Sequence, residues 1–203
     1  HECRFGTSCL ILDVLWLNLE KVIRMPVIAI TGSPGTGKTT LSNQLPKERY
    51  DQYTVEQIAT ELGCIEHLDG DNVVTTELLT KWKYAGDKIA IIEGHLSHHC
   101  KVDAVLLLRC HPIELNSRLQ SRDAYGAKKI QQNIEWEMIA GIWSELVENS
   151  PNLPILELDM TAPLDGIESI ELFISDHDER KTVQESIPLA IDWLSGDNVS
   201  ESI

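Results

Sequence analysis

The stretch that decides the fold is Gly32-Ser-Pro-Gly35-Thr-Gly37-Lys38-Thr39. It fits the pattern G-x-x-x-x-G-K-[ST] and comes just after Pro26–Ile30, a short apolar run rich in β-branched residues. A buried strand, a glycine-rich turn and the start of a helix in this order predict a loop whose backbone N–H groups surround a polyphosphate. The alternative interpretation is a glycine-rich turn that happens to precede a lysine.

The loop residues have distinct expected roles. Gly35 and Gly37 let the backbone wrap around phosphate groups, Lys38 reaches the β- and γ-phosphates, and Thr39 ligates Mg²⁺. The sequence therefore predicts a site for ATP with magnesium, although such a loop identifies the nucleotide and leaves the reaction open.

Strand-like and helix-like segments alternate along the rest of the chain. Further buried strands are expected at Lys88–Ile92, Ala104–Leu108 and Pro154–Leu158, with a weaker candidate at Tyr53–Val55. The expected helices are Lys38–Leu45, Val55–Leu62, Asn72–Trp82, Pro112–Arg122, Lys128–Val147, Thr161–Ile174 and Thr182–Leu194. This alternation predicts an α/β fold of the P-loop class, a three-layer sandwich with a parallel central sheet of about five strands.

The longest expected helix, Lys128–Val147, has an apolar residue at every fourth position, which gives one apolar stripe along the helix. The stripe comprises Ile130, Ile134, Met138, Ile142 and Leu146.

Composition limits the function classes. The 203 residues are 42% hydrophobic and 24% charged, as in globular proteins, and no apolar run reaches the ~20 residues of a membrane span. The net charge is −15, and most of it lies between Glu145 and the end, where fourteen acids face two bases. This acidity disfavours direct contact with nucleic acid and suits either solubility or a basic protein partner. Five scattered cysteines without CxxC spacing predict a reducing, cytoplasmic location.

Three parts of the chain differ in character. Residues 1–24 fit poorly with the rest of the chain and are expected to lie upstream of the natural start at Met25, with an additional docked helix as the alternative. Residues 25–174 are predicted to form the P-loop domain, and residues 175–203 an acidic helical tail.

Missing motifs narrow the reaction. The Asn-Lys-x-Asp base reader of GTPases does not occur, and Leu194-Ser-Gly-Asp197 falls short of the signature of ABC ATPases. A kinase of a nucleotide or another small molecule remains.

The next candidates come after the strand Lys88–Ile92. Glu93 ends this strand at the sheet edge where the phosphate loop lies, so we expect it to hold Mg²⁺. His95 comes two residues later and is expected to orient or deprotonate a water or an acceptor. The alternatives are a helix-capping acid and a loop histidine without a chemical role.

Further cations come after the fourth strand. Arg118 and Arg122 lie four residues apart on an expected helix, and Lys128 and Lys129 come shortly after it. Such cations could close over the triphosphate and stabilise the developing charge. The alternative is a solvated helix face.

The candidate acceptor arm carries Asp71, which is expected first as an N-cap of the helix Asn72–Trp82 and second as a contact to the acceptor.

Several motifs together resemble the adenylate kinase isoenzyme 6 family in its archaeal form. They are the segments 27–41, 68–74, Ile92-Glu-Gly-His-Leu-Ser-His98, Leu107-Leu-Arg-Cys-His-Pro112 and Asn133-Ile-Glu-Trp-Glu137. The resemblance spans about Met25 to Val147, and it implies a nucleoside monophosphate kinase-like fold and phosphoryl transfer from ATP to AMP. It also implies ATPase activity in maturation of the small ribosomal subunit, with a ribosomal protein as partner.

The resemblance also implies site residues. Gly35, Gly37, Lys38, Thr39 and Thr40 would bind ATP, Arg122 would be the lid arginine, and Glu93 and His95 would fill the acid-x-His positions.

Two features depart from the family pattern. Asp123–Ala127 is one residue longer than the usual lid spacing, and residues 54–88 contain no arginine for the acceptor phosphate. Lys81, Lys83, Lys88 or Arg109 would have to substitute for it. An AMP kinase, an assembly ATPase and a kinase of another small acceptor therefore stay open.

Overall fold

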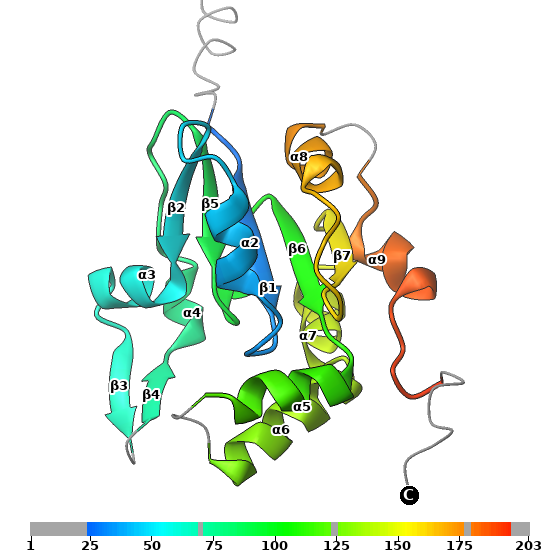
Figure 1. Cartoon of the computed structure of the whole chain (residues 1–203). Helices are drawn as coiled ribbons and strands as arrows, with labels where there is room; N and C mark the ends of the chain where they lie inside the picture. Colours follow the sequence, from blue (N-terminus) through cyan, green and yellow to red (C-terminus); the bar gives the residue numbers. More distant parts are fainter. Residues whose placement is uncertain (1–23, 69–70, 123–125, 177–179, 196–203) are drawn as a thin grey trace, which may run out of the picture.

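The central feature of the fold is a five-stranded parallel sheet. The computed structural model describes residues 24–68, 71–122, 126–176 and 180–195. The strand order is β2-β5-β1-β6-β7, so the loop-bearing strand is central (Figure 1). The strands are β1 Val27–Gly32, β2 Tyr50–Thr54, β5 Ile89–Glu93, β6 Ala104–Arg109 and β7 Ile155–Asp159. The expected α/β sandwich is confirmed.

Helices cover both faces of the sheet. On β1, Ile28 and Ile30 pack in the layer that includes α2 and α8, whereas Val27 and Ala29 face the opposite layers of α3 and α7. This alternation is the two-residue period of a strand that is buried on both faces. The helices are α2 Lys38–Gln44, α3 Val55–Glu61, α4 Thr76–Leu79, α5 Pro112–Gln120, α6 Ala127–Met138, α7 Gly141–Asn149, α8 Glu168–Ser175 and α9 Val183–Ser186, with 3₁₀ turns η1 Ser97–His99 and η2 Ile187–Leu189.

The largest departure from the sequence prediction lies at Asn72–Trp82, which does not form one helix. Residues of β3, Ile65–Leu68, pair antiparallel with those of β4, Asp71–Val74, and only the short α4 comes after them. Asp71 therefore begins a strand, and its expected role as a helix N-cap is wrong. Val73 and Val74 are β-branched and favour a strand, and the pairing with β3 outweighs the weak helical pattern.

The expected long helix Lys128–Val147 is two helices. Ala140 adopts a left-handed conformation with φ of 51° and separates α6 from α7. At the break, the indole of Trp136 packs directly on Gly141. A side chain at this position would clash with the ring, because a Cβ there would lie 2.2 Å from it. The apolar stripe is therefore divided between the two helices. Ile142 and Leu146 of α7 are buried, whereas the stripe residues of α6 are half-buried and the buried side chain of α6 is that of Glu137.

The late helices are shorter than expected. The predicted Thr161–Ile174 helix contracts to α8, and Thr182–Leu194 to α9 and η2. Residues 190–195 then form neither helix nor strand, and this segment is called the C-terminal strap. Thr182 forms a bridge with Pro154, and Val183 is fully buried, so this described part of the predicted tail packs on the sheet domain.

Parts of three predictions lie outside the described residues: residues 1–23 of the N-terminal extension, residues 123–125 of the lid, and residues 177–179 and 196–203 of the acidic tail. Within the described ranges, no helix combines the length and apolarity needed to cross a bilayer.

Candidate active site

The phosphate loop has the backbone geometry that its glycines predict. Gly35 and Gly37 have φ values of 96° and 97°, a region that favours glycine. At Gly32, with φ of 149°, a Cβ would lie 2.4 Å from the carbonyl oxygen of Leu108 on the neighbouring strand. The loop therefore fits closely against the end of β6 and leads directly into α2, as a cradle for phosphate requires.

Lys38 is positioned across this loop. Its ammonium group donates to the carbonyl oxygens of Gly32 and Ser33, both at 2.9 Å. Burial lowers the pKa of Lys38 to about 8, with the charge of Glu93 opposing the shift and that of Arg122 adding to it. An incoming phosphate would supply negative charge and stabilise the protonated ammonium.

This pKa predicts a pH dependence of ATP binding. Above about pH 8 the unliganded protein loses the Lys38 proton, so binding requires proton uptake and affinity falls as the pH rises. Between pH 7.5 and 9.5 calorimetry should show a loss of roughly tenfold or more. A Lys38→Arg variant should give a flatter profile because guanidinium does not titrate there. A flat profile for the unaltered protein would contradict this assignment.

Thr39 and Glu93 lie together, as the sequence predicts. The Thr39 hydroxyl lies 3.1 and 3.2 Å from the two carboxylate oxygens of Glu93. Parallel pairing of β1 with β5 brings the two side chains to the same sheet edge. A hydroxyl and a carboxylate are hard oxygen donors, and with Thr39 exposed and Glu93 half-buried they fit Mg²⁺ that retains several waters.

A cleft of about 460 Å³ opens beside the loop. His95 lines it, with its side chain exposed to the open space. Desolvation and then the charge of Lys38 lower the pKa of His95, to about 4. Its imidazole is therefore neutral at pH 7 and can accept a hydrogen bond or a proton.

The predicted cations divide between different places. Arg122 and Lys129 line the phosphate cleft, together with Asn133 of α6. Lys128 is exposed and is not among the residues that line it. Helix α5 ends at Gln120, so Arg118 and Arg122 do not share a helix as expected.

A second cleft continues from the loop past Thr40. Arg118 and Arg122 line it with Met160 and Leu164. The guanidinium of Arg118 is held by the carboxylate of Glu114 at 2.8 Å and the carbonyl of Thr161 at 3.0 Å. Arg118 thus lies beside the nucleotide loop rather than over the phosphate cleft.

None of the four cations predicted to bind the acceptor phosphate is among the residues that line the phosphate cleft. Arg109 is wrong for this role, since its side chain is only 2% exposed and pairs with Glu137 and Glu157. Lys88 precedes β5 at the sheet edge opposite the loop. Its ammonium group donates to the backbone carbonyl oxygen of Lys47 and lies 3.8 Å from the carboxylate of Asp51. Lys81 and Lys83 are exposed, outside the residues that line the phosphate cleft. On the acceptor arm, Asn72 of β4 is the residue that lines the cleft.

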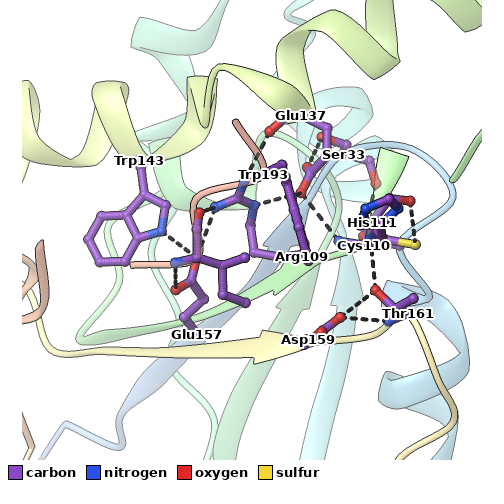
Figure 2. A network of polar contacts seen from close by, with 12 residues as sticks. Ser33, Arg109, Cys110, His111, Glu137, Trp143, Glu157, Asp159, Thr161 and Trp193 are labelled. Atoms are coloured by element: carbon purple, nitrogen blue, oxygen red, sulfur yellow. Dashed lines mark hydrogen bonds and ion pairs between the residues drawn. The ribbon is translucent and has the colours of Figure 1, made fainter. Parts of the chain in front are cut away.

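Sequence reasoning missed a buried polar network beneath the loop, which Figure 2 shows. One carboxylate oxygen of Glu137 accepts from the hydroxyl of Ser33 in the loop at 2.6 Å. The other accepts from the guanidinium of Arg109 at 2.6 Å and from the indole of Trp193 at 3.1 Å. Burying a carboxylate is costly unless it is paired, and these donors satisfy it.

The network extends to the C-terminal strap. Glu157 of β7 accepts from Arg109 at 2.9 Å, from the indole of Trp143 at 2.6 Å and from the backbone N–H of Ile191 at 2.8 Å. Helix α6, the end of β6 and the strap therefore meet at Glu137, which connects them to Ser33 of the phosphate loop (Figure 2). The sequence signal that could have indicated this network is an acidic residue, Glu137, beside the apolar stripe of the expected helix.

This chain is similar in sequence to a known domain family and to several archaeal proteins that share one description. A family model described as an AAA domain matches residues 28–140. A protein of Archaeoglobus fulgidus described as "putative adenylate kinase" is 36% identical over 172 residues, covering 83% of this chain and 92% of that protein. Proteins with the same description in Pyrococcus abyssi and Thermococcus kodakarensis are 36% and 32% identical, covering 66% and 82% of this chain and 75% and 92% of those proteins.

Proposed function

The chain belongs to the family of these archaeal adenylate kinase homologues, and we propose that it transfers a phosphoryl group from ATP to AMP, giving two ADP. The carrying observation is that Lys38, Arg122 and Lys129 line one cleft with the Thr39–Glu93 oxygen pair at its edge. Three cations around a site with hard oxygen donors are what positioning and charge neutralisation of a transferred phosphoryl group need.

The chain's residues would divide the work. The loop amides and Lys38 bind the phosphates, and Thr39 with Glu93 hold the magnesium ion, which supplies neutralisation of phosphate charge. Arg122 and Lys129 stabilise charge on the transferred group. An acceptor phosphate oxygen bonds to the γ-phosphorus, and the bond from that phosphorus to the β–γ bridging oxygen of ATP breaks, which releases ADP. His95 is neutral at pH 7, since desolvation lowers its pKa to about 4, and can orient the acceptor or a water.

We also propose the finer assignment to the isoenzyme 6 type. It rests on the Glu93-Gly-His95 motif, whose acid lies beside Thr39 and whose histidine lines the phosphate cleft. The acidic segment from Glu145 onward, with fourteen acids and two bases, supports a second candidate function in which ATP hydrolysis releases a basic ribosomal protein.

The proposed kinase activity is tested by measuring ADP formed from ATP and magnesium, with and without AMP. We expect AMP to accelerate ADP formation strongly, with two ADP formed per AMP consumed and no activity without magnesium. If AMP leaves the rate of ADP formation unchanged and inorganic phosphate accumulates, the protein is a hydrolase instead.

Two additions separate the alternatives. Replacing AMP with other nucleoside monophosphates and small hydroxyl acceptors tests whether the lack of arginine in residues 54–88 reflects a different acceptor. A pull-down at graded salt tests the assembly function: retention of one small-subunit protein that ATP releases would support it. Salt-sensitive retention of many basic proteins would count against it.

A further inference from the structure

We propose that His98, His99 and Glu145 form a binding site for a divalent transition-metal ion of the zinc class, separate from the Thr39–Glu93 pair. The nitrogen and oxygen atoms that these three side chains can offer lie within 4.8 Å of one another. Two come from the 3₁₀ turn η1 and the third from α7, so the cluster joins segments far apart in the sequence. Two imidazoles and a carboxylate favour zinc-class ions over magnesium, which prefers oxygen donors.

The distances suit coordination. Nε2 of His98 lies 2.8 Å from Oε2 of Glu145, and Nε2 of His99 lies 3.7 Å from the same oxygen. Around a tetrahedral zinc ion with bonds of about 2.0 to 2.2 Å, neighbouring ligand atoms are about 3.3 to 3.6 Å apart. The two observed separations fall on either side of this range, so small side-chain movements would complete the geometry.

The burial of the three side chains fits an accessible site. The side chain of His98 is 3% exposed, and those of His99 and Glu145 are 23% and 34% exposed. A fixed ligand on the protein side and two adjustable ones toward solvent let an ion enter without unfolding. Three protein ligands leave a fourth position for water or another small ligand, as in open zinc sites.

Thr31 contacts the ring nitrogen of His98 that faces away from Glu145. Its hydroxyl oxygen lies 2.9 Å from Nδ1 of His98 and 3.2 Å from the carbonyl oxygen of His95. When the single hydroxyl hydrogen goes to that carbonyl, His98 donates through Nδ1 and the lone pair on its Nε2 faces the Glu145 carboxylate. In the other tautomer Nε2 of His98 donates to the Glu145 carboxylate at 2.8 Å, and a bound metal ion would take the place of that hydrogen. A donor bond from the second nitrogen is the usual arrangement of a metal-bound histidine.

An ion at this position would link η1 to α7. In the sequence, η1 comes just after His95 of the phosphate cleft and α7 just after the helix that carries Glu137, so the ion would fasten together the two elements that follow these site residues. Binding to the folded state alone stabilises it, so the melting temperature should rise with zinc concentration.

The test uses the full chain, treated with chelator and titrated with Zn²⁺ by calorimetry and with Co²⁺ by visible absorption. We expect one ion per chain, with the absorption of tetrahedral or five-coordinate Co²⁺ displaced by Zn²⁺. His99→Ala and Glu145→Ala should each weaken binding at least about tenfold. Glu148→Ala changes an exposed acid on the same helix and serves as the matched control.

Three results would overturn the proposal: no saturable binding of either ion, binding that persists unchanged in both variants, or equal weakening by Glu148→Ala. His98 is left in place because it is buried and contacts Thr31, so the two variants alter only the partly exposed ligands. Circular dichroism of each variant without metal shows whether it folds, which keeps loss of metal binding distinct from loss of structure.

Discussion

Replacing Lys38 with alanine is expected to lower the rate of phosphoryl transfer by about two to three orders of magnitude. The ammonium group lies within 2.9 Å of two loop carbonyls and points its charge into the cradle. No other cation that lines the phosphate cleft in the described part of the chain comes from the loop itself. Arg122 follows α5 and Lys129 lies in α6, so neither contacts the loop carbonyls as Lys38 does in the described hydrogen bonds.

The same substitution should change folding stability little. Burial disfavours the charged ammonium in the folded state and lowers the pKa of Lys38 to about 8, so removing the side chain also removes an unfavourable desolvation. Initial rates of ADP formation and thermal melts of Lys38→Ala should therefore diverge. Lys101→Ala, at an exposed position after η1, provides the control for loss of a lysine. A Lys38→Ala rate within tenfold of the unaltered protein would refute the assigned role.

Replacing Glu137 with leucine should destabilise the fold by about 3–5 kcal/mol, because it leaves the buried guanidinium of Arg109 with a single carboxylate partner. It also removes the acceptor of Ser33, Cys110 and Trp193. For a chain of this size, the melting temperature should fall by roughly 6–20 °C. Thermal denaturation monitored by circular dichroism measures the shift.

The matched control is Glu135→Leu, which alters an exposed acid on the same helix. Equal shifts in the two variants would show that the network contributes nothing specific. If Glu137→Leu does not fold, Ser33→Ala deletes one hydrogen bond of the network, which is worth about 1.5–3 kcal/mol because its acceptor is a carboxylate. That variant should keep the fold and weaken ATP binding, because the 2.6 Å contact between Ser33 and Glu137 anchors the loop. Unchanged ATP affinity would show that the network does not contribute to nucleotide binding.

Much of the site can be predicted from local sequence. The loop 32–39 is contiguous, its glycines have the backbone angles that a phosphate cradle needs, and Glu93 ends a strand that pairs with the loop-bearing strand. The positions of Thr39, Glu93 and His95 result from these local patterns, because parallel strands bring their carboxyl ends to one edge.

Other elements were mispredicted for identifiable reasons. Asp69-Gly70, a dipeptide typical of hairpin turns, lies in the sequence between β3 and β4 and could have indicated the hairpin. The apolar spacing from Ile130 to Leu146 fits one helix, but periodicity cannot detect the packing of Trp136 on Gly141 that accompanies the break. Arg109 ends a strand beside the loop, and only its partners show that it is structural.

The sequence by itself determined the central sheet, the phosphate loop and the acid Glu93 that meets Thr39, because each depends on local apolar runs and on where a strand ends. Only the tertiary structure decided which cations face the cleft, that Glu137 links Ser33 to Arg109 and Trp193, and that His98 and His99 meet Glu145. These contacts join residues 28 to 104 positions apart. Whether such pairs meet depends on how the layers pack, which no local pattern encodes.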